Sequence, residues 1–243
     1  MTKQGKFIVV EGTDGSGKKT QLDLLRRNLR KAGQGYEVLD FPRYYSNFWG
    51  ALIGRFLSGE FGDLDEVSPY LVAPYYALDQ AGSRKDIIRW KKEGKFILSN
   101  RYISSSLAHQ TAKLPEEEQE SFVKWLLEAG YKWLQMVKED LVIFLYIPAE
   151  ISFRLARDAK ARNRKKYIEN GREIAEENFD HQSKAAEMYL HLTERFEHWK
   201  LVNCVDSKNR LRSKRDIQAE ILRLLRDEEL YDGQLVFDPF NAI

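Results

Sequence analysis

The sequence predicts an α/β fold in which a five-stranded parallel sheet is flanked by helices. Five runs are strand-sized and rich in Val, Ile, Leu and Phe: KFIVVEG, YEVLDF, KFILSN, DLVIFLYI and WKLVNCVD. Their apolarity is continuous rather than alternating, which is typical of strands buried on both faces. Longer helical patterns separate the runs, and this order is typical of parallel strands joined by crossover helices.

The helical segments can be placed in order along the chain. Residues 19–32 follow the first strand and carry a stripe of leucines on one face: Leu22, Leu25 and Leu29. The AGQGY that comes next is a stop signal. A long helix is expected from Pro69 through YLVAPYYALDQAGSRKDIIRW, and Ser213 is the expected N-cap of the last helix, with Asp216 in its first turn. No internal repeat or linker interrupts the pattern, so we expect one domain spanning residues 1–243.

Composition excludes several classes of protein. The chain has 243 residues, of which 43% are hydrophobic and 31% charged, which excludes an intrinsically disordered protein. A net charge of +2 favours neither a nucleic-acid nor a membrane partner. The single cysteine, Cys204, can form neither an intrachain disulfide nor a thiolate cluster, which fits a reducing cytosol. We therefore expect a soluble, cytoplasmic protein.

The first strand leads into a phosphate-binding loop. Gly12, four further residues, Gly17 and Lys18 follow a strand and open a helix, which is the context that gives this pattern its mechanism. Backbone N–H groups of such a loop surround the β-phosphate, and the lysine reaches the β and γ oxygens. The alternative is a glycine-rich turn without a ligand. The expected ATP-binding residues are Gly12, Thr13, Asp14, Gly15, Ser16, Gly17, Lys18, Lys19 and Thr20.

The loop departs from the usual pattern at Lys19. A hydroxyl that ligates Mg²⁺ usually follows the conserved lysine, whereas here Thr20 comes one residue later and about 100° further round the helix. Because Mg²⁺ keeps several waters in most such sites, we expect water and the ATP phosphates to hold it. No direct side-chain metal ligand is assigned.

The motifs VEGTDGSGKKTQ, DFPRY, NRYISSSLAHQ and an arginine-rich segment after FLYIPAE resemble the thymidylate kinase family, in the same order, from about Phe7 to Tyr189. The resemblance implies a three-layer P-loop kinase fold with an arginine-rich lid at about 154–175. It also implies transfer of the γ-phosphoryl group of ATP to dTMP, yielding dTDP, with Mg²⁺ as cofactor. It further implies a homodimer and no membrane or nucleic-acid partner.

Arginines are the expected catalytic groups besides Lys18, because the transferred group carries its charge on oxygens. Arg43 and Arg101 each follow a strand, which places them at the carboxyl edge of the sheet. The resemblance implies that both face the acceptor phosphate; each could instead form a structural ion pair. Residues 154–172 hold eight basic and two acidic residues, a net of about +6. The candidates from this segment are Arg157, Arg162 and Arg164; a solvated basic helix or an RNA-contact patch is the alternative.

The resemblance also places the acceptor nucleotide. Tyr76 matches an aromatic residue that stacks on thymine, Gln80 matches a base-contacting arginine, and Asp14 matches an acid near the acceptor's sugar and phosphate. Tyr75 or Tyr76 could instead be core packing. The other expected acceptor-site residues are Ser105, Ser106, His109 and Gln110. His109 stands where the family has a tyrosine, and a role in packing is equally open.

Two further positions depart from the family, since Asn100 and Tyr146 each replace an aspartate. Two alternatives stay open, and Lys19, Asn100 and Tyr146 motivate the second of them. One is a kinase for another nucleotide or nucleoside on the same scaffold. The other is a nucleotide-binding protein without catalysis.

Overall fold

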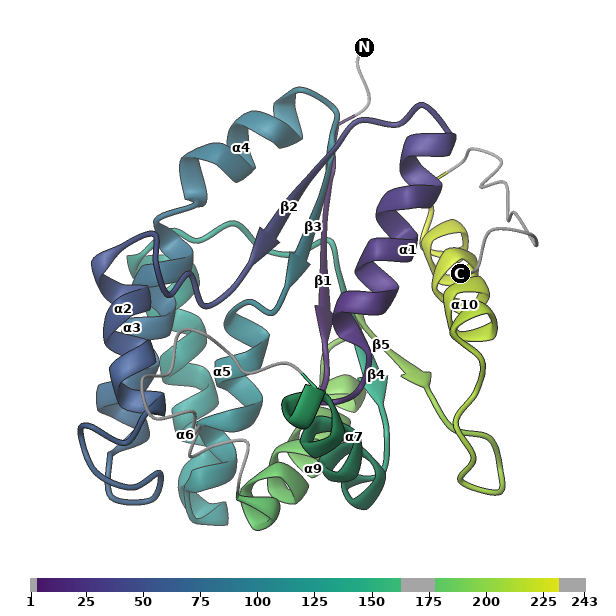
Figure 1. Ribbon diagram of the computed structural model, residues 1–243. Helices are drawn as coiled ribbons and strands as arrows, with labels where there is room; N and C mark the ends of the chain where they lie inside the picture. The colour runs from purple at the N-terminus through teal and green to yellow at the C-terminus, as the bar shows by residue number, and fades with distance from the viewer. Residues whose placement is uncertain (1–3, 163–177, 232–243) are drawn as a thin grey trace.

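A computed structural model describes residues 4–162 and 178–231, and the side chains of 159–162 are also outside the description. The five predicted strands form one parallel sheet with the order β2-β3-β1-β4-β5 (Figure 1). The strands are β1 Lys6–Glu11, β2 Tyr36–Asp40, β3 Phe96–Asn100, β4 Leu141–Tyr146 and β5 Trp199–Asn203. The predicted α/β fold with a five-stranded parallel sheet is therefore confirmed.

Helices cover both faces of this sheet (Figure 1). One face is covered by α1 Lys18–Lys31 and α10 Lys214–Asp227. The other is covered by α3 Pro69–Ala81, α4 Arg84–Lys92, α5 Ile103–His109, α6 Glu116–Leu127 and α9 Phe179–Arg195. The remaining elements are α2 Phe48–Leu57, a 3₁₀ turn at Thr111–Lys113, a π-helical turn at Glu128–Trp133 and α7 Ala149–Arg162.

Successive side chains of β1 enter two separate cores. Phe7 and Val9 pack with α3, α5 and α9, whereas Ile8 and Val10 pack with α1 and α10. All four are buried. Because successive side chains of a strand point to opposite faces, burial of both faces requires an unbroken apolar run. This is the physical reason for the continuous apolarity of the strands.

One predicted helix is wrong in its extent. The segment from Pro69 was expected to be a single helix, but it divides into α3 and α4 at Gly82 and Ser83. The N–H of Ser83 bonds the carbonyl of Gln80, three residues back, which closes α3 with a tight turn. By contrast, the N-cap prediction is confirmed, because Ser213 Oγ accepts the N–H of Asp216 at 3.1 Å.

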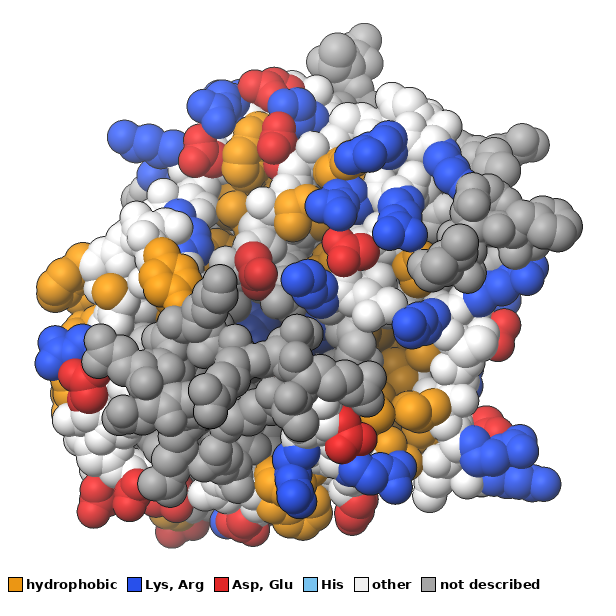
Figure 2. All heavy atoms as spheres, viewed as in Figure 1, with side chains coloured by type: hydrophobic (Ala, Val, Ile, Leu, Met, Phe, Trp, Pro, Cys, Tyr) orange, Lys and Arg blue, Asp and Glu red, His pale blue; other side chains and the backbone are white. Residues whose placement is uncertain are grey.

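The surface in Figure 2 mixes Lys and Arg side chains with Asp and Glu, in keeping with the small net charge of the sequence. Within residues 4–162 and 178–231, no helix combines the length and the apolar character needed to cross a membrane. The loops after β1, β3 and β4 meet at the carboxyl edge of the sheet, where ligands bind in folds of this kind.

Candidate active site

The loop between β1 and α1 has the backbone that a phosphate cradle needs. Gly12, Gly15 and Gly17 all have positive φ, at 149°, 88° and 89°, a region that side chains rarely adopt. The helix α1 begins at Lys18, directly after Gly17, so its first N–H groups and the positive end of its dipole border the loop. The loop is therefore built to face an anion.

Lys18 is held inside this loop. Its Nζ donates to the carbonyl of Gly12 at 2.8 Å and to that of Thr13 at 3.0 Å, and lies 3.7 Å from Asp14 Oδ1. The side chain is buried, at 8% exposure. The loop thus orients a single ammonium group toward the region that its own N–H groups surround.

The helix α7 is fastened to the same loop. Ser152 Oγ lies 2.6 Å from Thr13 Oγ1 and donates to the carbonyl of Asp14 at 2.6 Å. A Cβ at Gly15 would lie 2.5 Å from the carbonyl oxygen of Ser152 and 2.9 Å from the N atom of Ala156. Glycine is therefore required at this position, because α7 occupies the space that a side chain would need.

Glu11, at the end of β1, bonds the start of α5 and the helix α9, although it was not among the predicted site residues. It is fully buried. Its carboxylate accepts four hydrogen bonds, from Tyr102 N at 3.0 Å and from the hydroxyls of Ser104, Ser105 and Tyr189 at 2.7 Å each. Burial and the Glu11 charge raise the pKa of Tyr189 well above its usual value. An acid at the end of an otherwise apolar strand was the available signal.

Arg101 lies beside the phosphate loop, as its position after β3 predicts. Its Nη2 lies 2.7 Å from Asp14 Oδ1, and its Nη1 contacts Ser105 Oγ at 3.2 Å and His109 Nε2 at 3.3 Å. Burial opposes its charge, but the carboxylate of Asp14 and other charges outweigh this, so the pKa of Arg101 is raised. The residue has a left-handed backbone with φ of 65°, a conformation that costs about 1–2 kcal/mol for a side chain other than glycine. Such strain is typical of functional sites.

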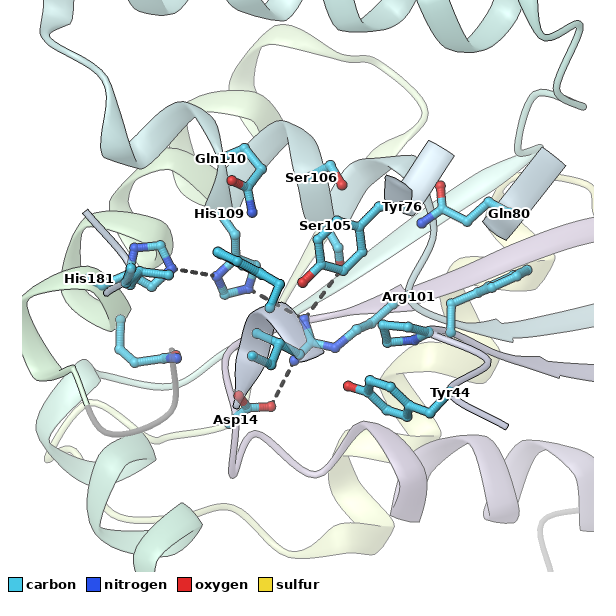
Figure 3. Close-up of a pocket in the computed structure, with 16 residues that line it drawn as sticks. Asp14, Tyr44, Tyr76, Gln80, Arg101, Ser105, Ser106, His109, Gln110 and His181 are labelled. Carbon is cyan, nitrogen blue, oxygen red and sulfur yellow. Dashed lines mark hydrogen bonds and ion pairs between the residues drawn. The ribbon is translucent and has the colours of Figure 1, made fainter. Parts of the chain in front are cut away.

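A cavity opens beside Arg101 and is lined by the residues predicted for the acceptor other than Arg43 (Figure 3). Among the residues predicted for the acceptor, those that line it are Asp14, Tyr76, Gln80, Arg101, Ser105, Ser106, His109 and Gln110. Phe56, Leu57 and Leu64 add an apolar wall. Tyr44, His181 and Gln182 also line the cavity; Tyr44 belongs to the DFPRY motif, whereas no motif in the sequence indicated the other two.

Several polar atoms at this cavity are buried without a hydrogen-bond partner in the described part of the chain. They are Oε1 of Gln80, Oγ of Ser106 and Oε1 of Gln110. These three residues are at most 4% exposed. Because buried polar groups are nearly always satisfied, such atoms grouped at one cavity point to a ligand with hydrogen-bonding edges.

The two adjacent tyrosines of α3 have different surroundings. Tyr76 lines the cavity, whereas the ring of Tyr75 stacks on Trp49 with centroids 6.3 Å apart and planes at 20°. Tyr76 therefore borders the cavity, and Tyr75 packs against α2.

Arg43 forms an ion pair with Asp79. Its backbone N and its Nε each donate to the carboxylate of Asp79 at 3.0 Å, and Asn47 donates to the same carboxylate at 2.7 Å. In the described chain, the residues that line the cavity include its neighbours Pro42 and Tyr44 but not Arg43. This geometry is that of the structural ion pair; a contact of Arg43 with phosphate stays a prediction.

The described chain offers no ready-made protein site for a metal. No three side chains of His, Cys, Asp or Glu gather there as metal ligands. Lys19 is exposed, and the amide of Asn100 donates to Asp40 Oδ1 at 2.7 Å, where an aspartate would repel it. All four hydrogen bonds to Glu11 come from the protein itself.

The predicted lid lies largely outside the described residues. Arg157 is exposed on α7, while the side chain of Arg162 and all of Arg164 fall outside the description. The roles expected for these three arginines stay predictions.

Comparisons with known proteins agree on one family. Residues 10–217 match the family described as thymidylate kinase. The chain is 34% identical over 233 residues to a probable thymidylate kinase of Thermococcus onnurineus, covering 92% of this chain and 98% of that protein. It is 31% identical over 157 residues to the thymidylate kinase of Mycobacterium tuberculosis, covering 65% and 73% of the two chains.

The fold is also similar to a solved structure, that of thymidylate kinase from Candida albicans. The two match with a TM-score of 0.70 at 20% identity, over 93% of each chain. At this identity the likeness concerns the fold.

Proposed function

The chain belongs to the thymidylate kinase family of nucleoside monophosphate kinases, and on that premise we propose that it transfers the γ-phosphoryl group of ATP to dTMP and releases dTDP. The observation that carries this proposal is one arrangement of residues. The Asp14–Arg101 pair joins the phosphate loop to a cavity at which Gln80, Ser106 and Gln110 have buried, unsatisfied polar atoms within the described chain.

The donor ATP is assigned to the loop and the start of α1. The loop N–H groups and Lys18 face the β and γ oxygens, where negative charge accumulates during transfer. Mg²⁺, which the family generally uses with ATP, would be held by phosphate oxygens and water. Bound there, it supplies further positive charge to the phosphates.

The acceptor phosphate is assigned to Arg101. A guanidinium carries five N–H donors in a planar fork that matches phosphate oxygens. Its contacts with Asp14, Ser105 and His109 set the direction of that fork at the boundary between the loop and the cavity. Alignment of two phosphates by fixed positive groups accounts for the catalysis, because the acceptor phosphate is itself a nucleophile and needs no strong base.

The base is assigned to the inner part of the cavity. Thymine presents an N–H donor between two carbonyl acceptors, and the amide of Gln80 offers one acceptor and two donors on a side chain that is only 1% exposed. The ring of Tyr76 would stack on the base, a contact worth roughly 1–3 kcal/mol. The apolar wall of Phe56, Leu57 and Leu64 suits the 5-methyl group.

A coupled phosphotransfer assay with ATP and Mg²⁺ tests the proposal. The acceptors are dTMP, dUMP, UMP, dCMP, dGMP, AMP and thymidine. We expect dTMP to have the highest kcat/KM and dUMP to follow about 10-fold or more below it, because one methyl group is worth about 1–3 kcal/mol in a fitted pocket. A nucleoside as best acceptor, or ATP binding without transfer to any member of the panel, would contradict the proposal.

The organisation of the protein is proposed with the function. We propose one domain, a cytoplasmic location and a homodimer. Leu71 and Tyr70 on α3 are 64% and 36% exposed, an apolar surface consistent with a second copy. Light scattering at micromolar concentration would show twice the mass of 28.5 kDa; a monomer would contradict the dimer.

A further inference from the structure

Four side chains form a continuous line from the phosphate loop to α9 (Figure 3). Asp14 Oδ1 lies 2.7 Å from Arg101 Nη2, Arg101 Nη1 lies 3.3 Å from His109 Nε2, and His109 Nδ1 lies 3.3 Å from His181 Nε2. All four residues line the cavity. His181 is the member that neither a motif nor the family resemblance indicated.

The direction of each hydrogen bond in this line follows from the chemistry of arginine. A guanidinium can only donate, so His109 Nε2 accepts from Arg101 and carries no proton. The proton of a neutral His109 is then on Nδ1, which donates to His181 Nε2. His181 in turn carries its own proton on Nδ1. With the proton on Nδ1 of both rings, each hydrogen bond from Arg101 to His181 has one donor and one acceptor.

The surroundings keep both rings neutral. Burial and the neighbouring positive charge of Arg101 hold the pKa of His109 well below its usual value. Burial lowers the pKa of His181 to about 4, with Lys113 lowering it further and Asp65, Asp14 and Asp180 opposing. His181 is 4% exposed, and its backbone N–H is bonded separately by Asn178 Oδ1 at 2.9 Å. The backbone of this residue is therefore held by the N-cap of α9 in addition to any contact of its imidazole.

We propose, resting on the proposed function, that His181 is a positioning residue for the acceptor phosphate. It accepts the Nδ1–H of His109 and so keeps His109 Nε2 as an acceptor for Arg101. Arg101 is thereby held from both sides, by Asp14 and by His109, with its fork directed at the junction of the loop and the cavity. Without an acceptor at 181, His109 is released to the other tautomer, which presents an N–H to Arg101 instead of a lone pair.

Two variants at this position separate positioning from packing. His181→Gln keeps an acceptor oxygen near the place of Nε2, whereas His181→Phe keeps the ring volume and removes the acceptor. His191→Phe, at an exposed position on the same helix, is the matched control. The readouts are kcat, the KM values for dTMP and ATP, and the Kd for dTMP.

We expect His181→Phe to raise the KM and Kd for dTMP about fivefold, the value of one hydrogen bond, with the KM for ATP unchanged. His181→Gln and His191→Phe should stay within about twofold of the parent. The inference is overturned if His181→Phe leaves the Kd for dTMP unchanged. It is also overturned if Gln and Phe impair binding equally, because a packing role would not distinguish an acceptor from its absence.

Nitrogen NMR of the imidazoles tests the same inference without turnover. We expect Nδ1–H on both His109 and His181 at neutral pH, and loss of this tautomer of His109 in His181→Phe. An Nε2–H tautomer of His109 in the parent protein would overturn the inference. If the parent phosphorylates none of the acceptors, the proposed function fails instead, and the tautomer result remains readable.

Discussion

The hydroxyl of Ser152 lies 2.6 Å from the hydroxyl of Thr13, and the hydrogen bonds around them run in one direction. Ser152 donates its only proton to the carbonyl of Asp14, so Thr13 must be the donor to Ser152. Both residues are almost fully buried, at 2% and 1% exposure. The first turn of α7 is therefore bonded to the phosphate loop at two successive residues.

Ser152→Ala removes both bonds and leaves the buried hydroxyl of Thr13 without its acceptor. We expect the free energy of unfolding to fall by about 1–3 kcal/mol and the KM for ATP to rise, because the loop loses its support from α7. Urea denaturation and initial rates measure these effects. Ser121→Ala, whose exposed hydroxyl also bonds a carbonyl, is the control and should change stability by less than about 0.5 kcal/mol. Equal effects of the two changes would contradict the prediction.

Gly15→Ala places a methyl group against the backbone of α7. The new Cβ would lie 2.5 Å from the carbonyl oxygen of Ser152, at a residue with φ of 88°. Gly33→Ala is the matched control, because φ there is 68° and no described atom lies within 4 Å of the Cβ position. We expect about 1 kcal/mol of destabilisation at Gly33, and a clearly larger loss at Gly15 accompanied by a lower kcat/KM for ATP. The prediction fails if the two variants unfold at the same urea concentration.

Lys18→Ala should lower kcat at least about 100-fold while the protein stays folded. The ammonium donates to two carbonyl groups of its own loop and lies 3.7 Å from Asp14, and its proposed task is to offset charge on the transferring phosphoryl group. Lys31→Ala, at the exposed end of the same helix, is the control. Rates are measured alongside circular dichroism. A folded Lys18→Ala enzyme with parental kcat would remove the phosphate-loop assignment.

Gln80→Leu should lower kcat/KM for dTMP by about 10-fold or more, with the KM for ATP unchanged. The substitution puts an apolar side chain of similar size at a 1%-exposed position, and it leaves the hydrogen-bonding edge of the base unpaired. Acceptor profiles of the parent and the variant provide the measurement. An unaltered acceptor profile would show that the base does not contact Gln80.

Glu139→Gln should stabilise the protein increasingly as the pH rises. Glu139 is 6% exposed, accepts the hydroxyl proton of Tyr131, and burial raises its pKa from 4.5 to about 7. In the folded parent Glu139 keeps a proton that the unfolded chain releases above pH 4.5. Its contribution to the free energy of unfolding is therefore fully present at acid pH and is lost as the pH rises through 7. Glutamine does not ionise. The difference in unfolding free energy, variant minus parent, should therefore grow by about 2 kcal/mol from pH 5.5 to 8.5.

His109 and His181 change the free energy of unfolding in the opposite direction. Because their pKa values are lowered in the folded protein, their contribution to stability grows as the pH rises to about 6.5. That contribution is present in both proteins and cancels in the difference. Urea unfolding across the pH range is the measurement, with Glu118→Gln on the exposed surface of α6 as control. If the difference in unfolding free energy between Glu139→Gln and the parent changes with pH no more than the difference for Glu118→Gln, Glu139 is already ionised at pH 5.5 and the prediction is wrong.

The order of residues along the chain was enough to determine the fold class and to place the loop after β1 and Arg101 at the same edge of the sheet. Five apolar runs determine a sheet that is covered on both faces, because strand-length burial on two sides leaves no room for polar side chains. The spacing from Gly12 to Lys18 determines the phosphate loop, since loop, strand and helix are contiguous in sequence. Arg101 was predictable for a similar reason, because the carboxyl ends of parallel strands meet at one edge.

Only the tertiary structure decided how distant side chains share partners. Arg43 and Arg101 look alike in sequence, yet Asp79 of α3 engages the first and Asp14 of the loop engages the second. The hydrogen bond between Ser152 and Thr13 joins residues more than 70 positions apart. The series of hydrogen bonds from His181 through His109 to Arg101 does the same. Sequence patterns report the burial that a residue needs, which is a local property, whereas the identity of its hydrogen-bond partner depends on how separate elements pack.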